Sequence, residues 1–355
     1  MAKGRAAHSL GQLLDSYARA GELYEHLDGK AVRCYACGHR CLIHEGRRGI
    51  CKVRFNREGT LMVPAGYVAG LQVDPVEKKP FFHVMPGAPV LTFGMLGCSL
   101  HCPFCQNWIS SQALRDEGAG TAPEPIDARA MVEAGLRHGV TLVASSYNEP
   151  LITTEWAAEV FKEAKSKGQG TLYVTNGYAT PEVLEYLRPW LDGLSIDLKC
   201  FSDRGYRWLG GVLKRVLEGI QRAHEMGFWV EVVTLVVPGF NDSDEELRET
   251  ARFLTSVSAD IPWHVTAFYP TYKERGRERT PPRTLLRAAD IGREEGLRFV
   301  YAGNLPGIVE SLEDTRCPDC GGTLVERWGY QIRRYRITEE GRCPDCGTSI
   351  PGIWQ

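Results

Sequence analysis

Short apolar runs alternate with helix-length connections over most of the chain. The runs lie at about residues 90–96, 140–146, 171–175, 193–198, 229–237, 263–269 and 298–301. Strands that alternate with helical segments in this way are typical of parallel sheets built from βαβ units. The pattern therefore predicts an α/β fold with a partial (β/α)6-type barrel over residues 85–310.

Helix start signals fall between these runs. Asp127 can cap a segment whose apolar residues share one face, Thr180 precedes a proline at a second start, and residues 241–244 begin a third. Asp and Thr side chains accept hydrogen bonds from free N–H groups at a helix start, and Pro is favoured in the first turn. These signals support helices in the connections.

We predict that residues 1–29 form an amphipathic helical extension. Four apolar side chains share one helical face, at Leu10, Leu13, Leu14 and Tyr17. The segment lacks the continuous apolar core of a signal peptide. The most apolar stretch, 228–240, is interrupted by Glu231 and Pro238, so we expect no membrane span and a cytoplasmic protein.

Acidic and basic side chains nearly balance. The chain has 42 Lys and Arg against 44 Asp and Glu, a formal net charge of -2. This balance gives no support to nucleic-acid binding by the chain as a whole. Glycine is frequent, at 38 of 355 residues, which predicts turns where backbone closely approaches a bound cofactor.

Cysteine carries most of the candidate chemistry. Eleven of the 12 cysteines fall into three groups, which in a cytoplasmic chain predicts metal sites. Cys200 stands alone, and we interpret it as a small buried residue. The groups are Cys34, Cys37, Cys41 and Cys51; Cys98, Cys102 and Cys105; and Cys317, Cys320, Cys343 and Cys346.

The last group has the spacing of a zinc ribbon. Two Cys-Pro-Asp-Cys-Gly knuckles, at 317–321 and 343–347, flank a strand-like stretch. Two such pairs supply four thiolates for tetrahedral zinc, and so short a segment needs a metal to fold. We therefore predict a zinc ribbon over residues 311–355. Its five Arg and five acids between 317 and 346 offer no basic stripe for nucleic acid.

The first group lies in a Cys-rich module predicted over residues 30–84. Its spacings of two, three and nine intervening residues can close around one zinc ion or an auxiliary 4Fe-4S cluster. They differ from the common ferredoxin patterns, and we predict structural zinc. Residues 30–57 contain eight Lys or Arg and one acid, Glu45. This basic charge can neutralise the thiolates with their metal, or dock an acidic partner or nucleic acid.

The middle group supplies three thiolates with no fourth cysteine nearby, in Cys98-Ser-Leu-His-Cys102-Pro-Phe-Cys105. A 4Fe-4S cube usually takes four thiolates, one per iron, so three leave one iron open for a substrate. Zinc held by these cysteines and His101 is the alternative, but His101 lies between two ligands and would strain a small chelate ring. The spacing therefore favours the cluster.

This octapeptide resembles the radical S-adenosylmethionine (SAM) superfamily, whose signature is C-x3-C-x2-C with an aromatic residue, here Phe104, before the last cysteine. The resemblance implies a 4Fe-4S cluster whose open iron chelates the amino and carboxylate groups of SAM. It also implies one-electron cleavage of SAM to methionine and a 5′-deoxyadenosyl radical that abstracts a substrate hydrogen. An electron donor such as flavodoxin or ferredoxin is the partner implied.

Polar residues follow the predicted strands at the end where such barrels place their chemistry. We expect Glu149 to bind the ammonium of SAM and Lys199 its carboxylate, with Asp197 as an internal counter-ion or ribose contact. Taken singly, Glu149 and Asp197 could be helix caps, Lys199 a surface charge and Gly239 a turn. The candidate cofactor contacts are Phe104, Asn148, Glu149, Asn176, Asp197, Lys199 and Gly239.

Further segments, among them EKKPFFHVMPG, SYNEP, VTNGY, SIDLK and VVPGFNDSDEEL, extend the likeness from about residue 22 to the C-terminus. They resemble the pyruvate formate-lyase activating-enzyme branch, and within it the radical SAM enzyme of the AmmeMemoRadiSam system. That resemblance implies activation of a glycyl-radical protein or a pathway with two companion proteins. The alternative function is a non-catalytic iron-sulfur electron carrier or zinc-rich binding protein.

Two departures from the activating-enzyme pattern concern the cofactor site. Tyr147-Asn148-Glu149 stands where activating enzymes carry Gly-Gly-Glu, which keeps the acid and changes the backbone that binds the ammonium. Some activating enzymes carry Asp-Thr-Asn-Gly, which serves a monovalent cation. In this chain the stretch reads Val-Thr-Asn-Gly, so Val174 replaces the aspartate. The sequence therefore gives no support to a cation there.

Overall fold

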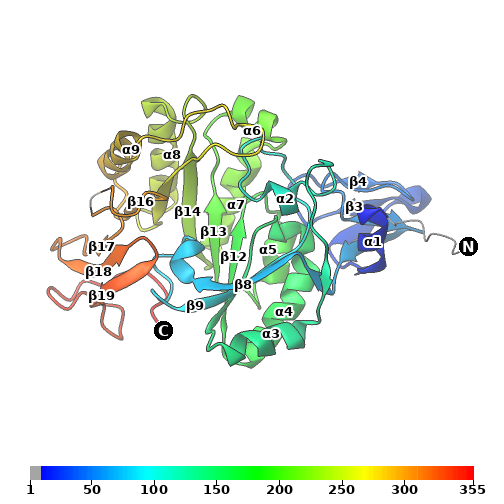
Figure 1. Cartoon of the computed structure of the whole chain (residues 1–355), viewed down its shortest axis with the longest axis horizontal. Helices are drawn as coiled ribbons and strands as arrows, with labels where there is room; N and C mark the ends of the chain where they lie inside the picture. Colours follow the sequence, from blue (N-terminus) through cyan, green and yellow to red (C-terminus); the bar gives the residue numbers. More distant parts are fainter. Residues whose placement is uncertain (1–8, 310) are drawn as a thin grey trace, which may run out of the picture.

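The computed structural model of the protein describes residues 9–309 and 311–355. Its centre is an eight-stranded sheet whose members are β8 Gly70–Pro75, β9 Pro89–Gly94, β11 Leu142–Ser145, β12 Gly170–Thr175, β13 Gly193–Asp197, β14 Trp229–Val236, β15 Trp263–Ala267 and β16 Val300–Gly303. They follow the order β16-β15-β14-β13-β12-β11-β9-β8 (Figure 1). Strand β9 and strands β11 to β16 pair in parallel, and each corresponds to a predicted apolar run. Because β16 and β8 are the two edges, the barrel is open, and the predicted α/β fold is confirmed.

Helices occupy the connections between parallel strands within the described residues. Asp127 and Thr180 cap the first and third of the longer helices by accepting hydrogen bonds from Ala130 N at 2.8 Å and Val183 N at 3.2 Å, as predicted. None of the described helices is long and apolar enough to cross a bilayer. The longer helices are α3 Ala128–Arg137, α4 Thr154–Ser166, α5 Pro181–Leu187, α7 Leu213–Glu225, α8 Asp244–Val257 and α9 Pro282–Glu294. α6 Asp203–Leu209 is a further helix, equal in length to α5, and shorter turns are α2 Trp108–Ser111, η2 Val76–Lys78 and η3 Pro150–Thr153.

The core lies where these helices pack on the sheet. Phe93 of β9, Phe161 of α4 and Tyr173 of β12 are fully buried, with ring centroids 6.2 and 5.5 Å apart. Burial of each aromatic side chain stabilises the fold by a few kcal/mol at ~25 cal/mol per Å² of apolar surface. This packing holds the strand ends, which carry the candidate site, in fixed positions.

The described part of the N-terminal segment, from Ser9 onward, contains one α-helix. Helix α1 covers Leu10–Ser16, Ser9 caps it with a capping box, and residues 1–8 lie outside the described ranges. The chain then becomes extended and pairs with the Cys-rich module, so the helical extension predicted over 1–29 ends at Ser16. The elements of this region are β1 Ala18–Ala20, β2 Tyr24–His26, η1 Asp28–Lys30, β3 Val32–Cys34, β4 Leu42–Ile43, β5 Phe55–Arg57 and β6 Thr60–Pro64, in the sheets β1-β6-β5 and β2-β3-β4.

The boundary predicted at residue 85 differs from the structure. Strand β8 lies before it, yet β8 pairs antiparallel with β9 from Gly70↔Gly94 to Pro75↔Pro89. The central sheet therefore begins at residue 70. A small pair, β7 Tyr67–Val68 with β10 Glu124–Pro125, adjoins this edge.

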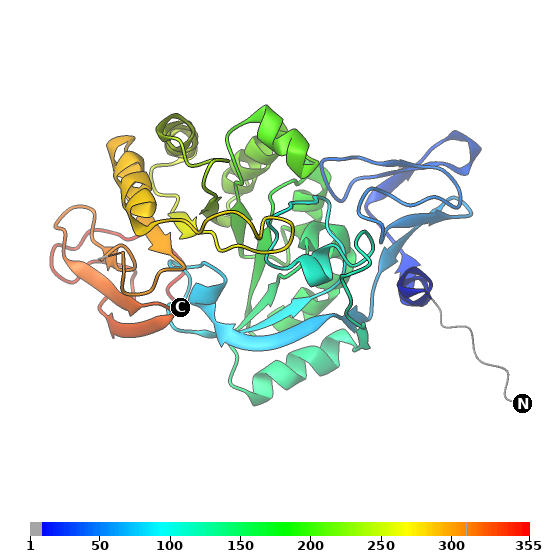
Figure 2. The ribbon, with the colours of Figure 1, turned by 45° about the horizontal axis from the view of Figure 1, so that its top comes forward.

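The C-terminal ribbon contains β17 Thr315–Arg316, β18 Thr323–Trp328 and β19 Gln331–Tyr335 in one antiparallel sheet. Arg327 fastens it to the barrel, because its Nη2 donates to the Phe82 carbonyl at 2.8 Å. The backbone of Met85 donates to the Ile353 carbonyl at 2.7 Å. Figures 1 and 2 show the ribbon and the Cys-rich module at opposite ends of the molecule, with the barrel between them.

Candidate active site

A cavity of about 360 Å³ opens at the carboxyl ends of the parallel strands. It collects side chains from the loops after β9, β11, β12 and β13, as parallel α/β folds place their sites. Gly239 lies outside this lining, in a turn where its N–H donates to Asp242 Oδ1 at 2.8 Å. The predicted residues that line the cavity are Cys98, Cys102, Phe104, Cys105, Asn148, Glu149, Asn176, Asp197 and Lys199.

The loop from Cys98 to Cys105, called the radical loop below, is clamped from outside the cavity. Arg115 Nη1 donates to the Leu100 carbonyl at 2.9 Å, and its Nη2 donates to the Cys98 carbonyl at 2.8 Å. His101 is not part of the cavity lining and packs on Gly210, where an added Cβ would lie 2.3 Å from the imidazole ring. The structure therefore does not bring His101 to the three cysteines as a fourth ligand.

Two of the three sulfurs lie next to hydrogen-bonding groups. Leu100 N donates to Cys98 Sγ at 3.3 Å, and Ser111 Oγ lies 3.2 Å from Cys105 Sγ. Burial raises the pKa of all three thiols, that of Cys102 to about 12. A bound metal is what stabilises thiolates in such a place, and donors of this kind tune iron-sulfur clusters. The donor set therefore fits a cluster held by three thiolates.

Glu149 joins two loops of the cavity. Its Oε1 accepts from Thr175 Oγ1 at 2.6 Å and from Leu151 N at 3.0 Å, and its Oε2 accepts from Asn176 N at 2.8 Å. Burial raises the pKa of Glu149 to about 7, although these hydrogen bonds oppose the shift. The Glu149 carboxylate therefore caps the helical turn η3, which was one of the two predicted roles, and it also lines the cavity.

The two amides beside Glu149 set the loop positions. Asn148 Oδ1 accepts from Met95 N at 2.9 Å, which ties the β11 loop to the end of β9. Asn176 Nδ2 donates to Ser99 Oγ at 3.0 Å, inside the radical loop. Both side chains therefore hold the cavity walls in register.

Lys199 and Asp197 form an ion pair at the end of β13, with Nζ and Oδ2 3.0 Å apart. Burial alone would lower the pKa of Lys199, but the Asp197 carboxylate raises it above its ordinary value. Lys199 is therefore a fixed cation that faces the cavity. Its role as a surface charge is excluded, because its side chain is only 18% exposed.

Phe104 fixes the far end of the radical loop. Its ring packs against Phe240 and Trp208, with centroids 5.4 and 6.1 Å apart. The ring is buried and also borders the cavity. It therefore holds the Cys102–Cys105 turn in place by packing.

Sequence reasoning missed a polar group on the opposite wall. Lys79 Nζ bonds Asp74 Oδ2 at 2.9 Å and Tyr147 Oη at 3.2 Å. Tyr147 adopts φ +68, a left-handed conformation that glycine takes freely, where activating enzymes carry the first Gly of Gly-Gly-Glu. The segment EKKPFFHVMPG and the Tyr147 departure were the only signals for this group in the sequence.

A second cavity of about 650 Å³ adjoins the first and carries it toward the ribbon. Lys78, Gln106 and Tyr330 border both cavities. The ribbon hairpin supplies one wall through Trp328 and Tyr330, and β15 supplies another through His264. The ribbon thus takes part in the site instead of serving only as a distant staple.

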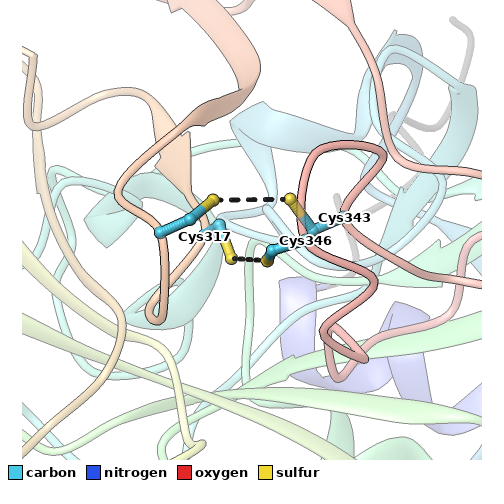
Figure 3. A group of neighbouring side chains, drawn as sticks. Cys317, Cys343 and Cys346 are labelled. Carbon is cyan, nitrogen blue, oxygen red and sulfur yellow. Dashed lines mark hydrogen bonds between the residues drawn. The ribbon is translucent and has the colours of Figure 1, made fainter.

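The ribbon cysteines gather tightly enough for one metal ion (Figure 3). Their four sulfurs lie within 4.8 Å of one another, with 3.5 Å between Cys317 and Cys346 and 3.7 Å between Cys320 and Cys343. Zinc–sulfur bonds of ~2.3 Å in a tetrahedron place sulfurs ~3.8 Å apart. The spacing predicted from the two knuckles therefore forms a metal-binding group.

The fold and the cavity define an enzyme of the type that builds its site on three cysteines after the first barrel strand. The family model described as the radical SAM superfamily matches residues 93–254. An uncharacterized protein of Methanocaldococcus jannaschii is 36% identical over 317 residues, which cover 89% of this chain and 93% of that relative. The chain belongs to the radical SAM superfamily.

Two relatives are named for activating functions. The isethionate sulfite-lyase activating enzyme of Oleidesulfovibrio alaskensis is 30% identical over 132 residues, which cover 36% of this chain and 42% of that relative. The pyruvate formate-lyase 1-activating enzyme of Escherichia coli is 27% identical over 174 residues, 47% of this chain and 69% of that relative. The predicted likeness to activating enzymes is confirmed.

Proposed function

We propose that Cys98, Cys102 and Cys105 hold a 4Fe-4S cluster and that SAM binds beside it in the cavity of about 360 Å³. The convergence of three cysteines with a carboxylate and a fixed cation on this cavity carries the proposal. When bound, the cluster supplies the electron that cleaves SAM to methionine and a 5′-deoxyadenosyl radical. The remaining tasks belong to the protein: to bind, orient and shield the reactants.

The chain offers one partner for each charged group of the methionyl part of SAM. Among the described residues, Asn176 N is the one donor to Glu149 Oε2, which has a further lone pair for an ammonium group. Lys199, oriented by Asp197, can donate to the carboxylate. Because both groups are fixed before SAM arrives, little side-chain entropy is lost on binding.

The second cavity is the proposed place of the substrate hydrogen. It is continuous with the first through Gln106 and Tyr330, so a group inside it lies next to the SAM cavity. A glycyl-radical protein is one proposed substrate, supported by the activating-enzyme relatives. A substrate of the AmmeMemoRadiSam system with its companion proteins is the other, supported by the segment resemblance. Genes adjacent to this one separate the two.

Two further components belong to the proposal. A low-potential donor such as flavodoxin or ferredoxin supplies the electron, and the ribbon cysteines hold zinc as a structural metal. The tight sulfur group supports the zinc. We place the working enzyme in the cytoplasm, where a reduced cluster and free thiols persist.

Anaerobic reconstitution tests the proposal. Protein loaded with iron and sulfide, then mixed with SAM and dithionite, should release 5′-deoxyadenosine measured by mass spectrometry. Cys98→Ala, Cys102→Ala and Cys105→Ala should each abolish the product, while Cys200→Ala should retain it. A cluster-loaded wild-type protein that forms no 5′-deoxyadenosine would contradict the function.

A further inference from the structure

The Cys-rich module packs directly on the radical loop. His39 Nε2 lies 2.9 Å from the Ser99 carbonyl oxygen. Arg115 Nη2 donates to the Ile50 carbonyl at 2.6 Å as well as to the Cys98 carbonyl. His39 and Ile50 each lie within two positions of a module cysteine. These contacts therefore connect the backbone near the module cysteines to Cys98 and Ser99, the first two residues of the radical loop.

Cys51 also lies close to Gly97. A Cβ added to Gly97 would lie 3.1 Å from the Cys51 carbonyl oxygen and 3.0 Å from Val53 Cγ1. Gly97 precedes Cys98, and consecutive Cα atoms are only ~3.8 Å apart. The backbone that carries one module ligand therefore touches the backbone that carries one radical-loop ligand.

The sulfurs of the module are gathered less tightly than those of the ribbon. Among the residues that the structure describes, the ribbon supplies the one group of three or more ligands whose atoms all lie within 4.8 Å. The ribbon sulfurs meet this limit, whereas no three sulfurs of Cys34, Cys37, Cys41 and Cys51 meet it. The radical-loop cysteines, which the family assigns to a cube, fall outside the same limit. By this measure the module matches the radical loop and differs from the ribbon.

The module also carries the donors that an iron-sulfur cluster uses. Arg54, whose side chain is 1% exposed, places Nη1 3.7 Å from Cys34 Sγ and donates from Nε to the Ile152 carbonyl at 2.8 Å. Ile50 N lies 3.5 Å from Cys41 Sγ. Hydrogen bonds and charge at the sulfurs set cluster potentials. Arg54 links this environment to the turn that begins beside Glu149.

We propose that Cys34, Cys37, Cys41 and Cys51 hold a second 4Fe-4S cluster that relays electrons to the radical-loop cluster. This inference rests on the proposed function and replaces the zinc that spacing alone favoured. A reduced flavodoxin or ferredoxin gives one electron to the module cluster, and the total charge of that cluster becomes more negative by one. The module cluster is reoxidised when it passes that electron to the radical-loop cluster, and no proton or atom is transferred.

The module and the ribbon, at opposite ends of the molecule, are consistent with separate sites for the electron donor and the substrate. The module exposes the basic residues Arg47 and Lys52 beside the apolar Ile50, which is 43% exposed. Acidic electron carriers associate with basic surfaces through electrostatic steering. Trp328 and Tyr330 of the ribbon line the second cavity, and the ribbon lies at the opposite end of the molecule from the module (Figure 2). A carrier on the module therefore leaves the substrate side open.

Metal content and spectroscopy of the full chain test the cluster. After anaerobic reconstitution we expect about eight iron and one zinc per chain, whereas about four iron and two zinc would overturn the proposal. The triple variant Cys98→Ala/Cys102→Ala/Cys105→Ala should retain about four iron and a 4Fe-4S Mössbauer signal. Cys200→Ala is the matched cysteine control and should keep the full wild-type iron content.

Donor choice tests the relay. In Cys51→Ala, formation of 5′-deoxyadenosine should be lost with reduced flavodoxin and retained with dithionite, which reaches the radical-loop cluster without the module. Equal activity of wild type and Cys51→Ala with flavodoxin would overturn the relay. If Cys51→Ala does not fold, the test uses wild type: rapid-freeze EPR should show the module signal before the radical-loop signal. The reverse order would contradict the proposal. Loss of SAM cleavage with both donors in wild type would instead count against the proposed function.

Discussion

Thr175 donates its hydroxyl hydrogen bond to Glu149 Oε1 at 2.6 Å, which joins the end of β12 to the loop after β11. The bond leaves the carboxylate buried between two strands and in contact with the cavity. Under the proposed function, stability and SAM binding therefore both depend on Glu149. Its ionisation should be visible in both.

The first prediction concerns the pH dependence of stability. The folded-state pKa of Glu149 is raised from 4.5 to about 7, so the unfolded chain releases this proton more readily. This group's contribution to stability is thus fully present below pH ~4.5 and is lost as pH rises to ~7. Glu149→Gln should flatten the corresponding fall in Tm. Measurement of Tm for both proteins between pH 5 and pH 8 tests this prediction. Parallel plots of Tm against pH would contradict the raised pKa of Glu149.

The second prediction concerns Lys199. Lys199→Ala should weaken SAM binding, because the carboxylate of SAM loses its cation and Asp197 loses its partner. Loss of one charge of a buried pair costs ~2 to 5 kcal/mol, and the partial exposure of this pair favours the lower end of that range. We therefore expect the Kd for SAM to rise more than ~tenfold. Isothermal titration with SAM on cluster-loaded protein measures it, with the exposed Lys214→Ala as control. An unchanged Kd would remove Lys199 from the site.

The parallel strands were predictable because both faces of them are buried. In β11, the successive residues Leu142 and Val143 point to opposite faces and are 1% and 0% exposed, so this strand has the apolar run that a doubly covered strand shows. Strand β8 was missed because it forms the edge of the sheet and exposes Gln72 and Val73. Three-residue strands such as β1 carry too little pattern to detect, since their pairing with β6 depends on residues far along the chain.

The site shows the same division between local and distant signals. The cysteines and Glu149 lie in local motifs and were predicted to lie together at the strand ends, and the structure places them on one cavity. Lys79 was not predicted, because its contact with Tyr147 requires β8 to fold back on β9. Gly239 was chosen from a motif, and its positive φ serves a turn.

A third prediction concerns the buried ion pair between Arg54 and Glu155, whose side chains are each 1% exposed. Arg54→Met should destabilise the protein by ~3 to 5 kcal/mol, because Glu155 keeps a buried charge without its partner. The double variant Arg54→Met/Glu155→Gln should recover much of this loss. Urea unfolding of both single variants and of the double variant measures the coupling, and strictly additive effects would contradict it.

The ribbon gives a fourth prediction. Cys343→Ala should remove the zinc and loosen residues 311–355 while the radical-loop cluster stays formed, because the two metal sites share no ligand. Hydrogen exchange of the ribbon amides should rise, and iron content and SAM cleavage should stay at the wild-type level. Loss of iron together with zinc would show that the ribbon is required for the whole barrel to fold.

The last prediction isolates the contact between the two cysteine regions. Gly97→Ala adds a Cβ at φ +96, 3.1 Å from the Cys51 carbonyl oxygen, so the module or the radical loop must shift by a few tenths of an ångström to accept it. Gly66→Ala is the matched control, because Gly66 has φ +69 and nothing within 4 Å of an added Cβ. Each substitution carries the cost of a left-handed alanine, ~1 kcal/mol, and Gly97→Ala should cost more through crowding. We therefore expect a lower Tm and less bound iron in Gly97→Ala than in Gly66→Ala. Equal iron content in the two variants would mean that the module can move away from the radical loop without loss of either cluster.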